Sequence, residues 1–351
     1  MKNLQQLPHA TNRLRKVTII ISARNEEDNI EDCLTSLLAQ DYPKEFFEVL
    51  VIDDQSTDNT AYVISEFIRT HTFNCRMLKT NARGGKKLAF ILGLKEATGE
   101  LILTTDADCI TPPHWISAMN RCFDVTNAVF VAGPVMMQPC KSWFQKFQCL
   151  EFNALIASTA GAFGINRPLM SNGANMGILA QACREEMVKL NTVSGDDVFT
   201  MFYLKQKYGR KRLTFLNSPD SVVLTKTTDS FKDFIQQRIR WTSKSTSYTD
   251  RDVIYTALSV MCVNMLLLIA IAGSLVPSAG QNSIILRMVT MVSLILKTIF
   301  DYSLLVKYSG LFGQKDLIKY LPLAEIPVLI YTTLTGLLGT ILPYNWKGRK
   351  F

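Results

Sequence analysis

The longest uncharged segment of the chain lies in its last third and places the strongest limit on the fold. Residues 253 to 276 form a run of 24 amino acids without Asp, Glu, Lys or Arg. A helix needs about 20 apolar residues to cross the hydrocarbon core of a bilayer. The run therefore predicts a transmembrane helix at Val253–Val276, and we expect residues 246–351 to form a membrane region that ends in a short basic tail.

Two further apolar segments, Ser283–Val306 and Pro322–Pro343, contain charged residues. Ionisable groups at membrane depth are costly and usually face a protein interior or a polar cavity. Each segment could therefore span the bilayer, enter it and return, or lie at its surface, which predicts two to three transmembrane or re-entrant helices in all. The charged residues concerned are Arg287, Lys297, Asp301 and Glu325.

The distribution of positive charge bears on orientation. No apolar run follows Met1, so the chain shows no secretory signal, and we expect an integral protein of the inner (cytoplasmic) membrane whose amino-terminal domain faces the cytoplasm. The net charge of +8 is better explained by anionic lipid headgroups than by nucleic acid. Basic residues favour the cytoplasmic side both before and after the third apolar segment, whereas three crossings would put the tail outside, so either one segment does not cross or the rule fails. These residues are Lys307, Lys315, Lys319, Lys347, Arg349 and Lys350.

The eight cysteines are scattered and form no CxxC pair, and most of them stand inside apolar runs. Such a distribution predicts reduced, buried thiols and no disulfide framework or zinc site.

The first half of the chain alternates between strand and helix patterns. This alternation predicts an α/β domain with a mainly parallel sheet, whose ligands bind beyond the carboxyl ends of the strands. The predicted strands are Val17–Ala23, Phe47–Ile52, Arg76–Leu78 and Leu101–Thr105, and the predicted helices begin at Ile30, Ala61 and Lys86.

Asp106 and Asp108 directly follow the fourth predicted strand. Side chains alternate along a strand, so two residues separated by one are expected to point the same way. Mg²⁺ is commonly held by one or two carboxylates together with substrate phosphates. The pair therefore predicts a site for a divalent cation and a diphosphate.

Other polar clusters also stand where strands end or helices begin, and each alone would pass for an ordinary turn. After the first strand come Ser22, Ala23, Arg24, Asn25 and Glu26; after the second come Asp53 and Asp54; and Gly85 and Lys86 open the third helix. Because these clusters fall on one edge of one predicted sheet, they favour a nucleotide-binding site.

With these motifs the chain resembles the family-2 glycosyltransferases, inverting enzymes of GT-A fold that use nucleotide-sugar donors. The resemblance covers residues 17–245, after a cytoplasmic lead-in at residues 1–16. It departs from the family in having Asp196-Asp197 where Glu-Asp is usual and Gln55 where Gly is frequent. The matching motifs are SARNEE at 22–27, VIDDQSTD at 51–58, GK at 85–86, TDAD at 105–108, GDD at 195–197 and QRIRW at 237–241.

The resemblance implies a role for each motif. It assigns the catalytic base to Asp197, preceded by Asp196, although Asp197 could equally cap the helix that follows it. It assigns metal binding to Asp108 with Asp106, for Mg²⁺ or Mn²⁺, and places Asp106 also near the donor sugar or nucleoside. Nucleotide binding falls to Ser22, Ala23, Arg24, Asn25, Glu26, Asp53, Asp54 and Lys86, with UDP as the usual nucleotide of the family.

Gln237, Arg240 and Trp241 stand at positions i, i+3 and i+4 and share one helix face. The Arg can bind diphosphate oxygens and the Trp can stack on an acceptor sugar, although an amphipathic helix at the membrane surface would show the same pattern. The loop that contains Asn172, Gly173 and Asn175 is expected on the acceptor side.

The chain is thus expected to be a membrane-anchored, metal-dependent transferase that adds a sugar to a glycan or lipid-linked acceptor in cell-surface glycan, glycolipid or polysaccharide synthesis. Two alternatives are an inactive nucleotide-sugar-binding scaffold and a partner subunit of a polysaccharide synthase. Single transfer and polymerisation both stay open. A nicotinamide-dependent oxidoreductase is disfavoured because no Gly-x-Gly-x-x-Gly turn follows the first strand.

Overall fold

A computed structural model describes residues 13–81, 85–182, 197–277, 280–339, 341–347 and 349–350. The chain divides into two compact units, each described here by itself. Unit 1 comprises Met1–Met136 and Thr159–Lys226, and unit 2 comprises Met137–Ser158 and Thr227–Phe351. The boundary near residue 245 that the sequence predicts stays a prediction; by their contacts, residues 137–158 and 227–245 group with the apolar carboxyl-terminal helices.

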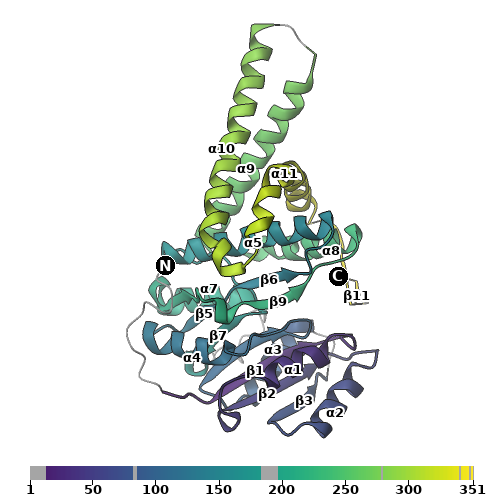
Figure 1. Ribbon diagram of the computed structural model, residues 1–351, viewed down its shortest axis with the longest axis vertical. Coiled ribbons are helices and arrows are strands. Elements are labelled where there is room, and N and C mark those ends of the chain that lie inside the picture. The colour runs from purple at the N-terminus through teal and green to yellow at the C-terminus, as the bar shows by residue number, and fades with distance from the viewer. Residues whose placement is uncertain are drawn as a thin grey trace. The chain divides into compact units, whose positions relative to one another are not determined.

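Unit 1 is built on a seven-stranded sheet with the strand order β3-β2-β1-β4-β7-β5-β8 (Figure 1). The first four of these strands are parallel, and β7 runs antiparallel to both of its neighbours. The predicted α/β architecture with a mainly parallel sheet is thus confirmed. The strands are β1 (Val17–Ala23), β2 (Phe47–Asp53), β3 (Cys75–Lys79), β4 (Leu101–Asp106), β5 (Phe130–Ala132), β7 (Met176–Leu179) and β8 (Leu213–Phe215).

Helices cover the sheet because its central strands are apolar on both faces. Every residue of β2 is buried, as is typical of a strand in a covered parallel sheet. Right-handed crossovers put α1 and α2 on one face and α3, which leads back to β4, on the other. Gly93 of α3 permits this packing, since a Cβ there would lie 2.6 Å from Cγ2 of Ile20. The helices of unit 1 are α1 (Ile30–Leu38), α2 (Thr60–Thr70), α3 (Gly85–Glu96), α4 (Trp115–Thr126) and α7 (Asp197–Tyr208).

The register of the three central strands brings their carboxyl ends level with one another. Ser22 of β1 pairs with Asp106 of β4, and Ala23 pairs with Asp53 of β2. The polar residues that follow these strands therefore emerge at one edge of the sheet, as the sequence predicted.

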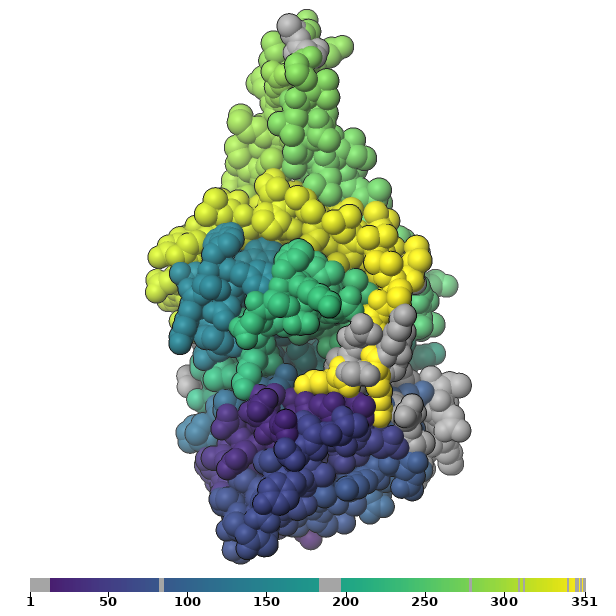
Figure 2. Space-filling model, turned by 90° about the vertical axis from the view of Figure 1, so that its right-hand side faces the viewer, coloured from purple at the N-terminus to yellow at the C-terminus, as the bar shows by residue number. Residues whose placement is uncertain are grey.

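Unit 2 contains three long apolar helices that could cross a membrane by their length and composition. Helices α9 and α10 run side by side as a hairpin (Figure 1). On the face shown in Figure 2, the green surface of this hairpin extends well beyond the yellow surface of the following segment. The helices of this part are α5 (Trp143–Gly164), which runs on into unit 1, α8 (Phe231–Thr242), α9 (Arg251–Leu275), α10 (Gln281–Phe312) and α11 (Leu321–Leu338).

Four charged residues within the apolar helices have partners. The guanidinium of Arg287 donates to the carbonyl oxygens of Ser274 (3.1 Å) and Val276 (3.3 Å), so it caps the end of α9 at the turn of the hairpin. Lys297 pairs with Asp301 one helical turn away (2.6 Å) and with Glu325 of α11. These contacts satisfy charges that would otherwise be costly in apolar surroundings.

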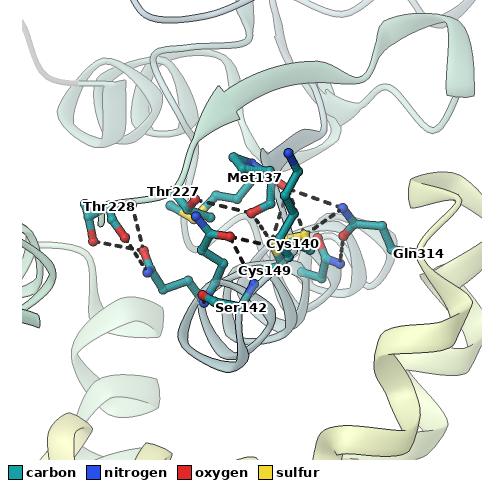
Figure 3. The surroundings of a disulfide bond; sticks show 12 residues. Met137, Cys140, Ser142, Cys149, Thr227, Thr228 and Gln314 are labelled. Atoms are coloured by element: carbon teal, nitrogen blue, oxygen red, sulfur yellow. Dashed lines mark hydrogen bonds between the residues drawn. A yellow bond between two sulfur atoms is a disulfide. The ribbon is translucent and has the colours of Figure 1, made fainter. Parts of the chain in front are cut away.

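The expectation that all cysteines are reduced is wrong for two of them. Cys140 and Cys149 form a disulfide, with their sulfur atoms 2.15 Å apart (Figure 3). Helix α5 begins at Trp143, so the bond joins Cys149 on this helix to Cys140 in the segment that precedes it. Gln314 contacts the same place, donating from Nε2 to the carbonyl oxygen of Met137 at 3.2 Å. Eight residues separate the two cysteines, and this spacing matches no short sequence motif, such as CxxC, from which the bond could be predicted.

Candidate active site

Asp106 and Asp108 lie in a tight turn and do not share a strand face as predicted. Strand β4 ends at Asp106, and the N–H of Cys109 donates to the Asp106 carbonyl oxygen (3.1 Å), which turns the chain at once. The expected alternation of side chains is therefore wrong for Asp108. The turn nevertheless brings the two carboxylates together, since ligand atoms of Asp106, Asp108 and Cys109 all lie within 4.8 Å of one another.

The donor set of this turn fits a hard divalent cation. The Cys109 side chain is buried, and burial together with the nearby Asp108 and Asp106 carboxylates raises the pKa of its thiol well above the usual value. A thiol is in any case a soft ligand, which hard divalent cations disfavour. The two carboxylates are partly exposed, and such oxygen ligands suit Mg²⁺ or Mn²⁺.

Lys86 places a positive charge beside this turn. It stands in the first turn of α3, and its Nζ forms an ion pair with Oδ1 of Asp106, with side-chain exposures of 40% and 31%. The pair joins two elements that the sequence had placed on the same edge of the sheet.

Asp197 is brought to the same cluster by Gly173. The N–H of Gly173 donates to Oδ2 of Asp197 (2.6 Å), and its carbonyl oxygen accepts from the hydroxyl of Thr104 on β4 (2.6 Å). A Cβ at Gly173 would lie 3.0 Å from Nζ of Lys86 and 3.5 Å from Cβ of Asp197. Glycine thus allows close approach of elements that are far apart in the sequence.

The other oxygen of Asp197, Oδ1, accepts the N–H of Val198 (2.9 Å) at the start of α7. The Asp197 carboxylate is thereby held at the helix start, in keeping with the capping alternative, and it also faces Gly173. Asp196, the other half of the predicted pair, lies outside the described residues.

The loops after β1 and β2 hold each other in place. Arg24 is buried and donates from Nη1 to the carbonyl oxygens of Asp54 (2.7 Å) and Gln55 (2.5 Å), while Oδ1 of Asn25 accepts the N–H of Thr57 (2.9 Å). Gln55 has a φ of +56°, a left-handed conformation that favours glycine, which explains why glycine is frequent at this position in the family that the chain resembles.

The predicted nucleotide-binding acids are largely buried under these loops. Oδ1 of Asp53 accepts the N–H of Ser56 (3.0 Å), and Oδ1 of Asp54 accepts from the hydroxyl of Thr80 (3.1 Å). Glu26 is also buried and accepts from Nδ2 of Asn29 (2.8 Å). These contacts fix the shape of the sheet edge beside Ser22 and Ala23.

Asn175 has a structural role that differs from the expected contact with an acceptor. It is fully buried, and its Oδ1 accepts from Nε1 of Trp115 (2.9 Å). Its Nδ2 donates to the carbonyl oxygens of Pro134 and Ser221, each at 2.7 Å. Asn172, by contrast, caps the turn locally by accepting the N–H of Ala174 (3.0 Å).

Gln237, Arg240 and Trp241 lie on α8 and belong to unit 2. The Trp241 ring lies 6.1 Å from the ring of Phe152 on α5. The motif also contains a residue that sequence reasoning missed: Arg238 is buried and pairs with Glu151 of α5. A buried Arg or Glu is rare and would have drawn attention to this pair. A single sequence does not show which residues are buried, so the pair could not be predicted.

Comparison with known proteins gives two family matches and several related structures. The model of glycosyl transferase family 2 matches residues 18–178, and that of glycosyl transferase family group 2 matches residues 101–336. Among solved structures, mannosyltransferase PcManGT from Pyrobaculum calidifontis, in complex with GDP-Man and Mn²⁺, is 18% identical with a TM-score of 0.56, over 95% of this chain and 90% of that one.

Two other structures are more distant. TarS 1–349 of S. aureus, in complex with UDP-GlcNAc, is 16% identical with a TM-score of 0.47, over 95% of both chains. Glucosyl-3-phosphoglycerate synthase of Mycobacterium tuberculosis is 16% identical with a TM-score of 0.42, over 63% of this chain and 75% of that one. The fold is that of the mannosyltransferase, and the family match extends over most of the sequence: the chain belongs to the family-2 glycosyltransferases.

Proposed function

We propose that this protein is a membrane-anchored, inverting glycosyltransferase that moves a sugar from a nucleotide-sugar donor to a glycan or lipid-linked acceptor. One observation carries the proposal: Gly173 donates to Asp197 and leaves room for Lys86 beside it, and Lys86 pairs with Asp106. A carboxylate able to serve as a base thus lies in one cluster with the acid pair at the end of β4. The arrangement joins residues from β4, α3, the loop before β7 and α7.

In an inverting transfer the acceptor hydroxyl attacks the anomeric carbon while the nucleoside diphosphate leaves. A carboxylate within hydrogen-bond reach of that hydroxyl accepts its proton as the new bond forms, which contributes about 10²–10⁴-fold to the rate. We assign this role to Asp197. Its bonds to Gly173 and Val198 hold the carboxylate in one orientation, which lowers the entropy that must be lost on reaching the reactive geometry.

Negative charge develops on the diphosphate as it leaves, and Lys86 is placed to offset part of it. Asp106 and Asp108 would hold Mg²⁺ or Mn²⁺, which supplies further neutralisation of the diphosphate when bound. The Pyrobaculum enzyme, whose fold this chain shares, is described in complex with Mn²⁺, and this supports a metal requirement here.

For the donor nucleotide we propose the edge formed by the loops after β1 and β2, where Asp53 and Asp54 hold the backbone. UDP is the nucleotide expected from the family, whereas the Pyrobaculum structure contains GDP-Man. Uridine and guanosine donors therefore both belong in any test. Gln237, Arg240 and Trp241 are proposed to bind the diphosphate and acceptor, together with Asn172 and Gly173.

The test is release of nucleoside diphosphate from a panel of UDP- and GDP-sugars, with membranes that contain the wild type, Asp197→Asn or Asp220→Asn. Asp220 is an exposed acid on a short helical turn of unit 1 and serves as the matched control. We expect a signal with one donor, dependent on Mg²⁺ or Mn²⁺ and abolished by a chelator. Asp197→Asn should lose at least about 100-fold of it, while Asp220→Asn keeps it.

Three outcomes would contradict the proposal in different ways. Donor binding without release, even with membrane lipid extract as acceptor, would favour a nucleotide-sugar-binding scaffold. Release only after a second membrane protein is added would favour a synthase subunit. Full activity of Asp197→Asn would remove the proposed base while leaving the family assignment intact.

A further inference from the structure

Arg238 lies inside the α8 motif, between the residues that the family resemblance singles out. Its side chain is 4% exposed and donates from Nη2 to the carboxylate of Glu151, which is 5% exposed. A buried ion pair of this kind becomes strongly destabilising when one partner is removed, because the other charge is left unpaired. Glu151 of α5 therefore holds the guanidinium of Arg238 from one side.

The guanidinium of Arg238 contacts two of the motif side chains. Its Nη1 donates to Oε1 of Gln237 (2.5 Å), which sets the direction of the Gln237 NH₂ group. The guanidinium carbon lies 4.3 Å from the ring centroid of Trp241 and 4.4 Å from that of Phe234. A planar guanidinium can stack on rings and donate in fixed directions at once, which an ammonium group cannot do.

Helix α11 holds the other oxygen of Glu151. The hydroxyl of Tyr331 donates to Oε1 of Glu151 at 2.5 Å, and the Tyr331 ring packs edge-on against Phe234 at 5.3 Å. Glu151 thus accepts from Arg238 with one oxygen and from Tyr331 with the other. An apolar helix is in this way connected to the α8 motif through two buried side chains.

We propose that Arg238 is a positioning residue for sugar transfer, which presents Gln237 and Trp241 in one orientation, and that Glu151 and Tyr331 hold its guanidinium in place. This inference rests on the proposed function. It gives a role to Arg238, which the motif contains but to which the resemblance assigns none, and it adds Glu151 and Tyr331 from outside the motif, so that the apolar helix α11 becomes a part of the support.

The experiment compares Arg238→Lys, Tyr331→Phe and their double variant with the wild type. Tyr255→Phe is the matched control, since it also removes one phenol hydroxyl but from an α9 side chain that is 66% exposed. We expect kcat to fall about tenfold in Arg238→Lys and several-fold in Tyr331→Phe, as loss of hydrogen bonds to a charged group predicts. Donor KM should change little. If Tyr331 acts through Arg238, the double variant should be no worse than Arg238→Lys alone.

A second readout separates this proposal from the proposed function. The chain has four tryptophans, so 5-fluorotryptophan labelling gives a small ¹⁹F NMR spectrum in which Trp241→Phe identifies one resonance. That resonance should shift in Arg238→Lys and Tyr331→Phe but not in Tyr255→Phe. If the Trp241 resonance shifts in these variants but the wild type does not turn over any donor, the positioning role of Arg238 stands and the proposed sugar transfer is wrong. An active wild type whose Trp241 resonance and kcat are unchanged in both variants would overturn the positioning alone.

A separate set of contacts concerns how often the chain crosses the membrane. The segment before α11 begins beside α5, because Oε1 of Gln314 accepts from Nδ2 of Asn153 (2.7 Å) and its Nε2 donates to Met137. The end of α11 reaches α8, since a Cβ at Gly339 would lie 2.2 Å from Oγ1 of Thr242. The first end of this segment therefore lies against α5, and its last end lies close to α8.

The α9–α10 hairpin has a different geometry from the α11 segment. Its turn lies at the far end of both helices, where Arg287 caps α9, about 37 Å of helix away from the start of α9. That length exceeds the hydrocarbon thickness of about 30 Å.

We infer that, of the three candidate spans in the described residues, α9 and α10 cross the bilayer and α11 enters it and returns, so that the basic tail lies on the same side as α8. This topology places the lysines before α11 and the basic residues of the tail on one side, as the positive-inside rule requires. It removes the conflict in the charge pattern that three crossings would create.

Thiol labelling of sealed membrane vesicles with an impermeant maleimide tests this topology. Single cysteines are introduced as Lys232→Cys on α8, Gly280→Cys at the hairpin turn and Arg349→Cys in the tail. Among the cysteines that the structure describes, Cys262 is the exposed free thiol, and it is removed by Cys262→Ser. Cys183, which lies outside the described residues, is replaced by Ser in the same background. We expect Lys232→Cys and Arg349→Cys to react from one side and Gly280→Cys from the other. Reaction of Arg349→Cys from the side of Gly280→Cys would establish a third crossing, and reaction of all three from one side would show that the hairpin does not cross.

Discussion

Asn175 shows how one buried amide can hold several parts of unit 1 together. It accepts from Trp115 and donates to the carbonyl oxygens of Pro134 and Ser221, so one side chain satisfies three polar groups in the core. Sequence reasoning placed it on the acceptor side because a loop of small and polar residues looks alike whether it faces a ligand or the core.

We predict that Asn175→Ala destabilises unit 1 by about 3–5 kcal/mol, because three buried polar groups lose their partners. Asn175→Asp should be at least as harmful, since a carboxylate cannot donate to the two carbonyl oxygens. Thermal unfolding in detergent micelles measures both, with Asn172→Ala as the control, whose side chain caps a local turn. A variant at 175 that unfolds like the wild type would contradict the structural role.

Lys86 yields a prediction about metal binding. Its ion pair with Asp106 places a cation on one of the two carboxylates proposed to hold the metal. Lys86→Met should therefore bind Mn²⁺ more tightly in the absence of donor, by up to about tenfold, while turnover falls because a positive charge beside the diphosphate is lost. Calorimetric titration with Mn²⁺ measures the first effect. The control is Lys87→Met, the next residue of α3; equal affinities in all three proteins would show that Asp106 does not bind the metal.

Among the elements, the central strands depend on a carboxylate at the edge opposite the site. Glu48 of β2 is buried and accepts from the hydroxyl of Thr18 on β1 (2.7 Å) and from the N–H and hydroxyl of Thr98 (2.8 and 2.7 Å). Burial alone would raise its pKa, but the hydrogen bonds from Thr98 and Thr18 outweigh it and hold the pKa below the usual 4.5. Glu48 thus joins β1, β2 and the turn into β4.

A carboxylate whose pKa is lowered by folding stabilises the protein above its unfolded-state pKa, and this stabilisation disappears as the pH falls through the folded-state value. Glu48→Gln should therefore cost about 1–2 kcal/mol at neutral pH. The difference between variant and wild type should shrink below about pH 4.5, where the unfolded-state Glu becomes protonated. Thermal unfolding over a pH series measures it, and a difference that stays constant down to strong acid would refute the assignment.

Helices and strands could be predicted from the sequence more accurately than the contacts between side chains. The strand Val17–Ala23 was predicted with the same ends that the structure has, because a run of β-branched residues between polar ones admits little else. The turn at Asp106–Cys109 was not foreseen, since its hydrogen bond depends on local backbone geometry. The Cys140–Cys149 bond and the Arg238–Glu151 pair depend on how α5 folds back, which no local pattern encodes.

At the scale of the whole molecule, the exposed apolar surface of α9 and α10 determines which treatments can extract the protein from a membrane. Large side chains along both helices are exposed, among them Leu258, Leu266, Val289 and Phe300. We predict that high salt and alkaline carbonate leave the chain in the membrane pellet and that detergent releases it, because apolar burial and not charge holds it there. Immunoblotting of the fractions measures this, and release by salt alone would contradict the anchor.

The hairpin also limits what the protein can do with its product. If α9 and α10 cross and α11 returns, as we infer, the helices of a single chain cannot enclose a water-filled conduit. A saccharide made by the chain without a partner subunit would then stay at the leaflet where it was made. If the cell displays that saccharide outside, a separate flippase or exporter must carry it there, and loss of that exporter should leave the glycosylated product accumulating on the inner leaflet.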